Sequence, residues 1–200
     1  MKKLSRSFYT RPTRTVAKEL LGKIFVRKNG NRFLTGRIVE TEAYLHNDPA
    51  CHAYRGITER NKVMFNTGGF LYVYFTYGMH FCANVVTYKE GIGEAVLIRA
   101  VEPVDGIDAM TKNRNFKDDR HLKGVGHLRA LTNGPAKFAQ AFNLTKEQSG
   151  IDLLGDEIFI TEYKGAAPFT VVSTTRIGIK VGIEKKWRYY IKGNEWISKK

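Results

Sequence analysis

RIVETEAYLH, residues 37–46, is the stretch that decides how the rest of the chain is arranged. Its β-branched and alternating polar residues predict a strand, and side chains two positions apart in a strand lie on the same face. Glu40, Glu42 and Tyr44 therefore share one face of this strand, which runs into a loop with two histidines. Such a face is either the solvated edge of an antiparallel sheet or a site where a carboxylate acts beside an aromatic ring.

Apolar spacing and turn signals predict the other elements. Arg11-Pro12 disfavours a helix over residues 5–14, Gly22 is a helix stop, and Asn29-Gly30-Asn31 makes the key strand the second arm of a hairpin. The expected helices cover residues 13–21, 60–65, 105–113 and 135–143. The expected strands cover residues 23–27, 33–44, 71–75, 81–87, 95–101, 158–163, 170–173, 176–179 and 187–191. This predicts an α+β fold: a single domain over residues 1–200 with a curved antiparallel β-sheet, a protruding β-hairpin and flanking helices.

The basic composition limits the classes of partner. The chain has 33 Lys and Arg against 19 Asp and Glu, a net charge of +14, and 10 tyrosines. That excess favours nucleic acid, although ribosomal RNA, an anionic membrane surface or solubility alone would also explain it. Neither a membrane span nor a secretory signal is predicted, so we expect an intracellular protein. Cys51 and Cys82 lack CxxC spacing, which predicts reduced thiols and no zinc site or disulfide.

A second informative stretch is FLYVYFTYGMHFCANVVTY, residues 70–88. Strand alternation on both sides of a Tyr-Gly-Met tip predicts the hairpin. Tyr77 and Met79 at this tip would either act as a wedge between base pairs or fold back onto the core. Tyr74 on one arm and Asn84 on the other would either stack on a base and read its edge or serve the structure only.

Arg99 is embedded in the apolar strand expected over residues 95–101 and therefore needs a carboxylate partner. Glu40, Glu42 and Glu102 are the candidates. The resulting ion pair would either hold a catalytic carboxylate ionised or be purely structural.

Two polar segments are expected to be loops. The first, residues 46–69, contains His52, and a loop histidine gains functional weight only from its neighbours. The second, residues 113–127, is rich in Lys, Arg and His. It would either contact DNA phosphates or form a solvated basic surface.

Several of these motifs together resemble the alkyladenine DNA glycosylase family, the mammalian-type 3-methyladenine DNA glycosylases. The matching motifs are RIVETEAYL (37–45), LYVYFTYGMHFCANVV (71–86), AVLIRAVEP (95–103), Asn133-Gly134-Pro135 and RIGI (176–179). The resemblance runs from about residue 15 to residue 198. It implies a monomeric, metal-free enzyme without a cofactor that removes alkylated or deaminated purines from duplex DNA and leaves an abasic site. The purines of this class are 3-methyladenine, 7-methylguanine, hypoxanthine and ethenoadenine.

The resemblance also implies roles for individual residues. Glu42 matches the general base that activates water, and Arg99 matches the residue that helps to hold Glu42 and the water. Tyr77 matches the residue inserted into the duplex, and we expect Met79 beside it to intercalate as well.

The base pocket follows from the same match. Tyr44, His52 and Tyr74 match the residues that sandwich the flipped base, and Asn84 matches the side chain that obstructs the exocyclic amino group of guanine. The loop over residues 46–61 differs in detail from the family, which leaves the preferred lesion open.

A different class of function is a non-catalytic basic nucleic-acid-binding protein that uses Tyr77 as a wedge to recognise damage. Glu42 discriminates between the two hypotheses, because a carboxylate aimed at a polyanion repels phosphates and gains a pure binder nothing. For the enzyme we expect a location in the cytoplasm or nucleoid of a bacterium, or in the nucleus of a eukaryote.

Overall fold

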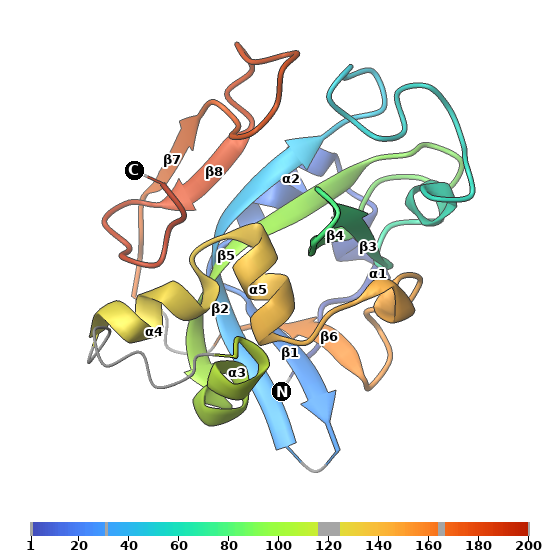
Figure 1. Cartoon of the computed structure of the whole chain (residues 1–200). Coiled ribbons are helices and arrows are strands. Elements are labelled where there is room, and N and C mark those ends of the chain that lie inside the picture. Colours follow the sequence, from blue (N-terminus) through green and yellow to red (C-terminus); the bar gives the residue numbers. More distant parts are fainter. Residues whose placement is uncertain (1, 31, 116–124, 164–166, 200) are drawn as a thin grey trace.

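The structure, a computed structural model, describes residues 2–30, 32–115, 125–163 and 167–199. Its centre is one curved antiparallel sheet of eight strands (Figure 1). The strands are β1 (Ile24–Asn29), β2 (Arg32–Tyr44), β3 (Leu71–Thr76), β4 (His80–Val86), β5 (Ala95–Asp105), β6 (Ile158–Thr161), β7 (Val171–Thr174) and β8 (Arg188–Ile191). The sheet follows the order β3-β4-β5-β2-β1-β6, and β8 joins β2 to β7.

Strand β2 is the most central element of the sheet. It pairs with β5 on one side, and on its other side with β1 along its first half and with β8 along residues 40–42. Glu40 and Glu42 are fully buried in this second half. The interpretation of this face as a solvated sheet edge is therefore wrong.

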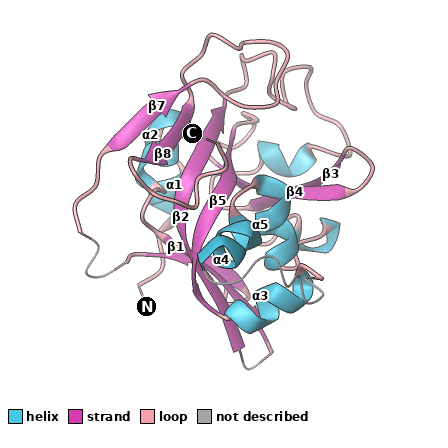
Figure 2. Cartoon of the chain, turned by 60° about the vertical axis from the view of Figure 1, so that its left-hand side comes forward, coloured by secondary structure: helices cyan, strands magenta, loops and turns pink. Residues whose placement is uncertain are grey.

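Helices cover both faces of the sheet. The helices are α1 (Arg6–Tyr9), α2 (Thr13–Glu19), α3 (Ile107–Asn113), α4 (Val125–Thr132) and α5 (Pro135–Ala141), with 3₁₀ turns η1 (Lys62–Phe65) and η2 (Lys146–Gln148). Helices α3, α4 and α5 gather on one side of the sheet and α2 lies on the other (Figure 2). The predicted α+β class, with a curved antiparallel sheet, a hairpin and flanking helices, is confirmed.

The alternation of β2 separates a packed face from a polar one. On the packed face, Val39 and Ala43 are fully buried, and the hydroxyl of Thr41 donates to the carbonyl of Ala17 in α2 at 2.8 Å. Glu40 and Glu42 point the other way, as the period of two requires. The site is thus built on the face of β2 that α2 does not cover.

Three expectations about local structure are wrong. The arm over residues 5–14 contains the short helix α1, because Pro12 restricts only the residue before it and then precedes α2 directly. Residues 176–179 form a loop in place of a strand, with Gly178 at φ 78°. The expected basic loop 113–127 ends earlier, because α4 begins at Val125; its residues 116–124 lie outside the described part of the chain.

The described helices give no candidate for a membrane span, since none is long and apolar enough.

We predict that Phe25→Ala lowers the free energy of unfolding by about 3–5 kcal/mol. Phe25 is fully buried and packs edge-on against Phe138 of α5 and against Phe142 directly after α5, with ring centroids 5.1 and 5.4 Å away. Its loss leaves a cavity between sheet and helix. Chemical denaturation measures the effect, and Phe33→Ala on the same hairpin, 38% exposed, is the matched control with a loss below about 1 kcal/mol. Equal losses for the two variants would contradict this packing.

Candidate active site

A cavity of about 410 Å³ opens beside the β3–β4 hairpin, which is within the range of small-molecule pockets. Hairpin strands, β5, the end of β2, the loop after β2 and the loop after β7 all contribute to its lining. Six predicted site residues line it: Tyr44, His52, Tyr74, Tyr77, Asn84 and Arg99. Residues from distant parts of the sequence are thus brought to one pocket, as expected.

One wall of the pocket consists of aromatic rings. Tyr72 and Tyr74 are stacked with centroids 5.5 Å apart, and His52 meets Tyr74 edge-on at 4.5 Å. His52 Nδ1 lies 3.1 Å from the hydroxyl oxygen of Tyr72. These contacts hold His52 against the hairpin although it comes from a loop. Its position among aromatic rings makes it a candidate site residue.

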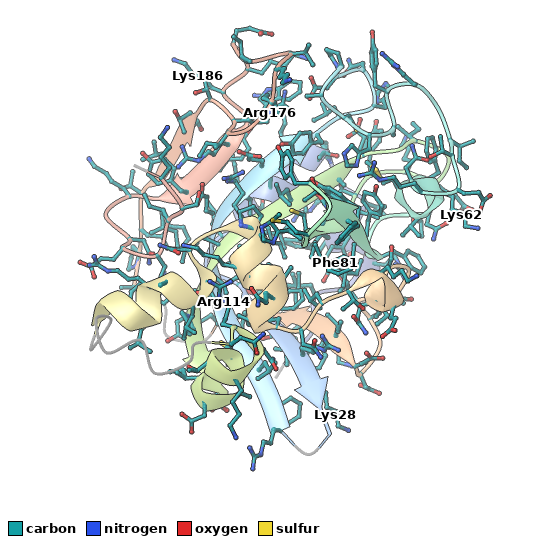
Figure 3. All side chains as sticks on the ribbon, viewed as in Figure 1. Lys28, Lys62, Phe81, Arg114, Arg176 and Lys186 are labelled. Carbon is teal, nitrogen blue, oxygen red and sulfur yellow. The ribbon has the colours of Figure 1, made fainter. Side chains whose placement is uncertain are left out.

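Tyr44 lies at another side of the pocket and is held by Arg176. The guanidinium carbon of Arg176 lies 4.7 Å from the centroid of the Tyr44 ring. Arg176 is buried and forms an ion pair with Asp48, which also accepts from Lys185 at 3.1 Å. Figure 3 shows Arg176 on the loop between β7 and β8, close to the top of the sheet. The ion pair therefore ties that loop to the residues that follow β2.

Glu42 lies next to the pocket, where it accepts two hydrogen bonds and forms an ion pair with Arg99. Its Oε1 accepts from the Ile177 backbone N–H at 2.8 Å and lies 3.2 Å from Arg99 Nη1, and its Oε2 accepts from the Tyr44 hydroxyl at 2.8 Å. The carboxylate thus has two hydrogen-bond donors and one positive charge as its partners. The side chain of Glu42 is fully buried, so its contact with the cavity runs through these lining residues.

Arg99 bridges two carboxylates. Its Nε donates to Glu40 Oε1 at 3.1 Å while Nη1 faces Glu42. Burial acts to lower the pKa of Arg99, but the charges of Glu42 and Glu40 outweigh burial, so the pKa is raised and Arg99 stays cationic. Glu102, the third candidate partner, instead lies 3.8 Å from Arg37.

A β-bulge sets the position of Arg99. Ala100 pairs with Glu40, and Ile98 pairs with the next residue, Thr41, so Arg99 is an extra residue without a partner in β2. Bulges re-aim side chains in this way. Arg99 is thereby placed where it reaches both glutamates.

Asn84 is anchored by the hairpin itself. Its Nδ2 donates to the backbone carbonyl of Tyr72, its partner across the strands, at 3.1 Å. This bond uses one of the two N–H donors of the amide and fixes the Asn84 side chain at the pocket wall.

The tip of the hairpin projects from the fold. Tyr77 is 79% exposed and Met79 is 68% exposed, so the alternative that they fold back onto the core is wrong. Tyr77 has a φ of 52°, in the left-handed region where a bulky residue is strained. Tyr77 also lines the mouth of the pocket, whereas Met79 does not.

The aromatic wall stays uncharged near neutral pH. Burial raises the pKa of Tyr72 to about 12 and raises that of Tyr74 further. Burial of the ring, and then the charge of Arg60, lowers the pKa of His52 to about 4. A neutral wall suits stacking on a base better than binding of a phosphate.

Comparison with known proteins identifies the family of the chain. A model of the methylpurine-DNA glycosylase family matches residues 7–195. The chain belongs to the methylpurine-DNA glycosylase family. The predicted family and the predicted enzyme class, a monofunctional DNA glycosylase that hydrolyses an N-glycosyl bond, are thereby confirmed.

Bacterial relatives of this glycosylase match along nearly their whole length. A protein of Carboxydothermus hydrogenoformans is 50% identical over 198 residues, covering 98% of this chain and 99% of the relative. A protein of Clostridium novyi is 47% identical over 205 residues, covering all of both chains. Each carries the name "Putative 3-methyladenine DNA glycosylase".

Sequence reasoning about this glycosylase missed some of the pocket. It gave no role to Arg176 or to the loop over residues 177–181, although RIGI (176–179) was among the matching motifs. Met64 and Leu97 also line the cavity, and nothing in their local sequence distinguishes them from core residues. The described residues contain no group of three or more His, Cys, Asp or Glu that could hold a metal ion.

We predict that His52 of this glycosylase titrates well below the ordinary histidine pKa of about 6.5. It then remains neutral from pH 8 down to pH 6, where an unperturbed histidine is already mostly protonated. NMR titration of the ring protons measures the midpoint, and His52→Gln assigns the signal. Arg60→Gln should raise the midpoint, because the Arg60 charge is one of the causes of the lowered pKa. A midpoint at or above 6.5 in the native protein would contradict the packing of this ring.

Proposed function

We propose that the protein hydrolyses the N-glycosidic bond of alkylated or deaminated purines flipped from duplex DNA, and leaves an abasic site. Its substrates are of the 3-methyladenine, 7-methylguanine, hypoxanthine and ethenoadenine class. The observation that carries the proposal is the buried carboxylate of Glu42, held by two hydrogen bonds and the ion pair with Arg99 next to an aromatic pocket.

The pocket suits a base taken out of the helix. A base stacked in a duplex hides its glycosidic bond, so a glycosylase must flip it out, at a cost of a few kcal/mol. Stacking on aromatic rings such as Tyr44 and Tyr74 returns about 1–3 kcal/mol per base. Damaged bases pair less well and cost less to extrude, which contributes to selectivity. Asn84 would then exclude guanine by facing its exocyclic amino group.

Glu42 would act on the sugar carbon and on water. Cleavage of the bond develops positive charge at this carbon, as in glycoside hydrolysis, and an ionised carboxylate stabilises that charge. Glu42 Oε2 accepts one hydrogen bond in the structure and has capacity for a second, to the attacking water. Accepting a proton from that water is worth about 10²–10⁴-fold in rate. Arg99 would keep Glu42 ionised throughout.

The hairpin tip would fill the gap in the duplex. Tyr77 and Met79 are exposed at a protrusion beside the pocket, and Tyr77 is kept in a strained backbone conformation. Proteins insert apolar side chains between base steps to open or kink DNA. A strained and exposed tyrosine is costly unless it contacts something, which favours this role.

The remaining properties follow from the same reaction. The net charge of +14 suits duplex DNA as the partner, and we propose that the chain acts as a single-domain monomer. Hydrolysis needs only water as co-reactant, so we propose no metal or cofactor. Its relatives are bacterial, and we propose that it acts in the cytoplasm, at the nucleoid.

A non-catalytic wedge protein is the weaker alternative. It would need the exposed tip and the positive charge but not an ionised carboxylate buried at the base of a pocket. Taking a carboxylate out of water costs several kcal/mol before its partners compensate it. Hydrolysis gives this buried carboxylate a function that a pure binder would not give it.

We predict that Glu42→Gln lowers single-turnover base release at least about 100-fold while binding to lesion DNA is kept or improved. Glutamine retains the size of the side chain but cannot accept the proton. The assay uses duplexes that carry one hypoxanthine, one 1,N6-ethenoadenine or one 3-methyladenine.

Glu102→Gln is the matched control, because Glu102 is also a strand glutamate near an arginine but lies outside the pocket lining. It should release the base at the native rate. Release by Glu42→Gln at the native rate would move the general base to another residue. Absence of release by the native protein from all three duplexes, with tight lesion binding, would support the non-catalytic alternative.

We predict that Tyr77→Ala weakens capture of the flipped state and lowers single-turnover excision about tenfold, because one stacking contact of 1–3 kcal/mol is lost. Fluorescence of ethenoadenine reports flipping, and binding to undamaged duplex should change little. Tyr163→Ala removes an exposed tyrosine outside the pocket lining and should have no effect. Unchanged flipping and excision in Tyr77→Ala would exclude the wedge.

A further inference from the structure

The carboxylate of Glu42 shares its arginine with a second buried carboxylate that the reaction does not use. Glu40 is fully buried, two residues before Glu42 on the same face of β2. Both glutamates contact Arg99, at 3.1 Å and 3.2 Å. Two negative charges beside one positive charge would favour protonation of one carboxylate, and a protonated Glu42 cannot act as a base.

Two further residues compensate Glu40. Arg188 of β8 is buried, and its Nε donates to Glu40 Oε1 at 2.6 Å. Ser198, close to the C-terminus, donates its backbone N–H to Glu40 Oε2 at 2.6 Å and its hydroxyl to Oε1 at 2.9 Å. The cluster thus contains two carboxylates and two guanidinium groups, and its formal charge is zero.

The C-terminal segment fixes both arginines as well. Arg99 Nη2 donates to the Ser198 hydroxyl at 3.2 Å, and Arg188 Nη2 donates to the backbone carbonyl of Lys199. Residues 198–199 therefore hold the guanidinium groups in the positions from which they reach Glu40. The last described residues of the chain complete a network whose other end lies beneath the pocket.

Charged and titratable groups from several elements surround Glu42. They are Arg99 on β5, Tyr44 on its own strand, Arg188 at the paired position of β8, Tyr74 and Cys82 on the hairpin, and Arg176 against Tyr44. Burial raises the pKa of each of Tyr44, Tyr74 and Cys82, so these three groups are neutral near pH 7. Arg176 pairs with the buried carboxylate of Asp48, which it shares with Lys185. The charge beside Glu42 is therefore set by Glu40, Arg99 and Arg188.

We propose that Arg188 and Ser198 are positioning residues for the reaction. Arg188 compensates the charge of Glu40 and Ser198 fixes its position, so that the charge of Arg99 stabilises the carboxylate of Glu42. The inference deepens the proposed function and rests on it. Neither residue lines the pocket, so their effect on catalysis is exerted through Arg99 and Glu40.

Charge counting predicts opposite effects for two single variants. Arg188→Met leaves two carboxylates with one arginine, so base release should fall at neutral pH and recover at higher pH. The acid limb of the rate profile, which is the pH range where the rate falls as Glu42 takes up a proton, should move up by about one pH unit or more. Glu40→Gln leaves one carboxylate with two arginines, so the acid limb should stay in place or move to lower pH. The double variant restores the balance and should return the limb to its native position.

The experiment is single-turnover excision from a hypoxanthine duplex between pH 5 and pH 9 for the native protein and the three variants. Arg37→Met is the matched control, because it removes an arginine from a glutamate of the same sheet outside the pocket lining. It should not move the acid limb. Limbs that stay in place in all variants, or a double variant that is worse than both single ones, would overturn the proposal and leave a purely structural cluster.

Two additions keep the test decisive. Arg188→Lys keeps the charge, so a native acid limb is expected from it even where Arg188→Met does not fold; an upward shift in Arg188→Lys would contradict the charge argument. Carboxyl ¹³C NMR of glutamate-labelled protein, with Glu42 assigned from Glu42→Gln, follows its ionisation without any activity. A native protein that releases no base from the hypoxanthine, ethenoadenine or 3-methyladenine duplex would overturn the proposed function, whereas an unchanged Glu42 titration in Arg188→Met would overturn this inference alone.

Discussion

The ion pair between Glu42 and Arg99 is the constraint on which the rest of the structure depends. A carboxylate at the centre of a sheet loses its hydration, and the loss costs several kcal/mol unless donors replace water. Strand β5 provides Arg99 through a bulge, Tyr44 provides a hydroxyl, and Ile177 provides a backbone N–H. The sheet order, with β2 between β5 and β8, is what brings these donors to one carboxylate.

The same interactions assemble the pocket. Tyr44 both donates to Glu42 and lines the cavity, and the loop that carries Ile177 is held against Tyr44 by Arg176. The pocket and the carboxylate beneath it are therefore parts of one hydrogen-bonded unit. Dipoles and charges that are fixed before the reaction do not have to reorganise during it, which is the main source of electrostatic catalysis. The hairpin tip contrasts with this buried unit, because Tyr77 and Met79 are largely exposed.

Much of the fold followed from local sequence patterns. The period-two alternation in β2 placed Glu40 and Glu42 on one face, and the hairpin around Tyr77 was evident from strand signals on both sides of a Tyr-Gly-Met tip. One failure shows what local patterns lack. RIGI (176–179) has the composition of a strand, but the Ile177 N–H bonds a carboxylate from a residue 135 positions earlier, and no local pattern reports such a partner.

The sequence by itself determined the α+β class and the family, and it predicted Tyr74 and His52 of the aromatic wall, because strand periodicity and long motifs are local properties of a chain. Only the tertiary structure decided that β2 is central, that Arg99 serves Glu40 and Glu42 but not Glu102, and that Arg188 completes the cluster. Ion pairing depends on distances of 3–4 Å across strands. Bulges and strand order set those distances, and they arise from packing of the whole sheet.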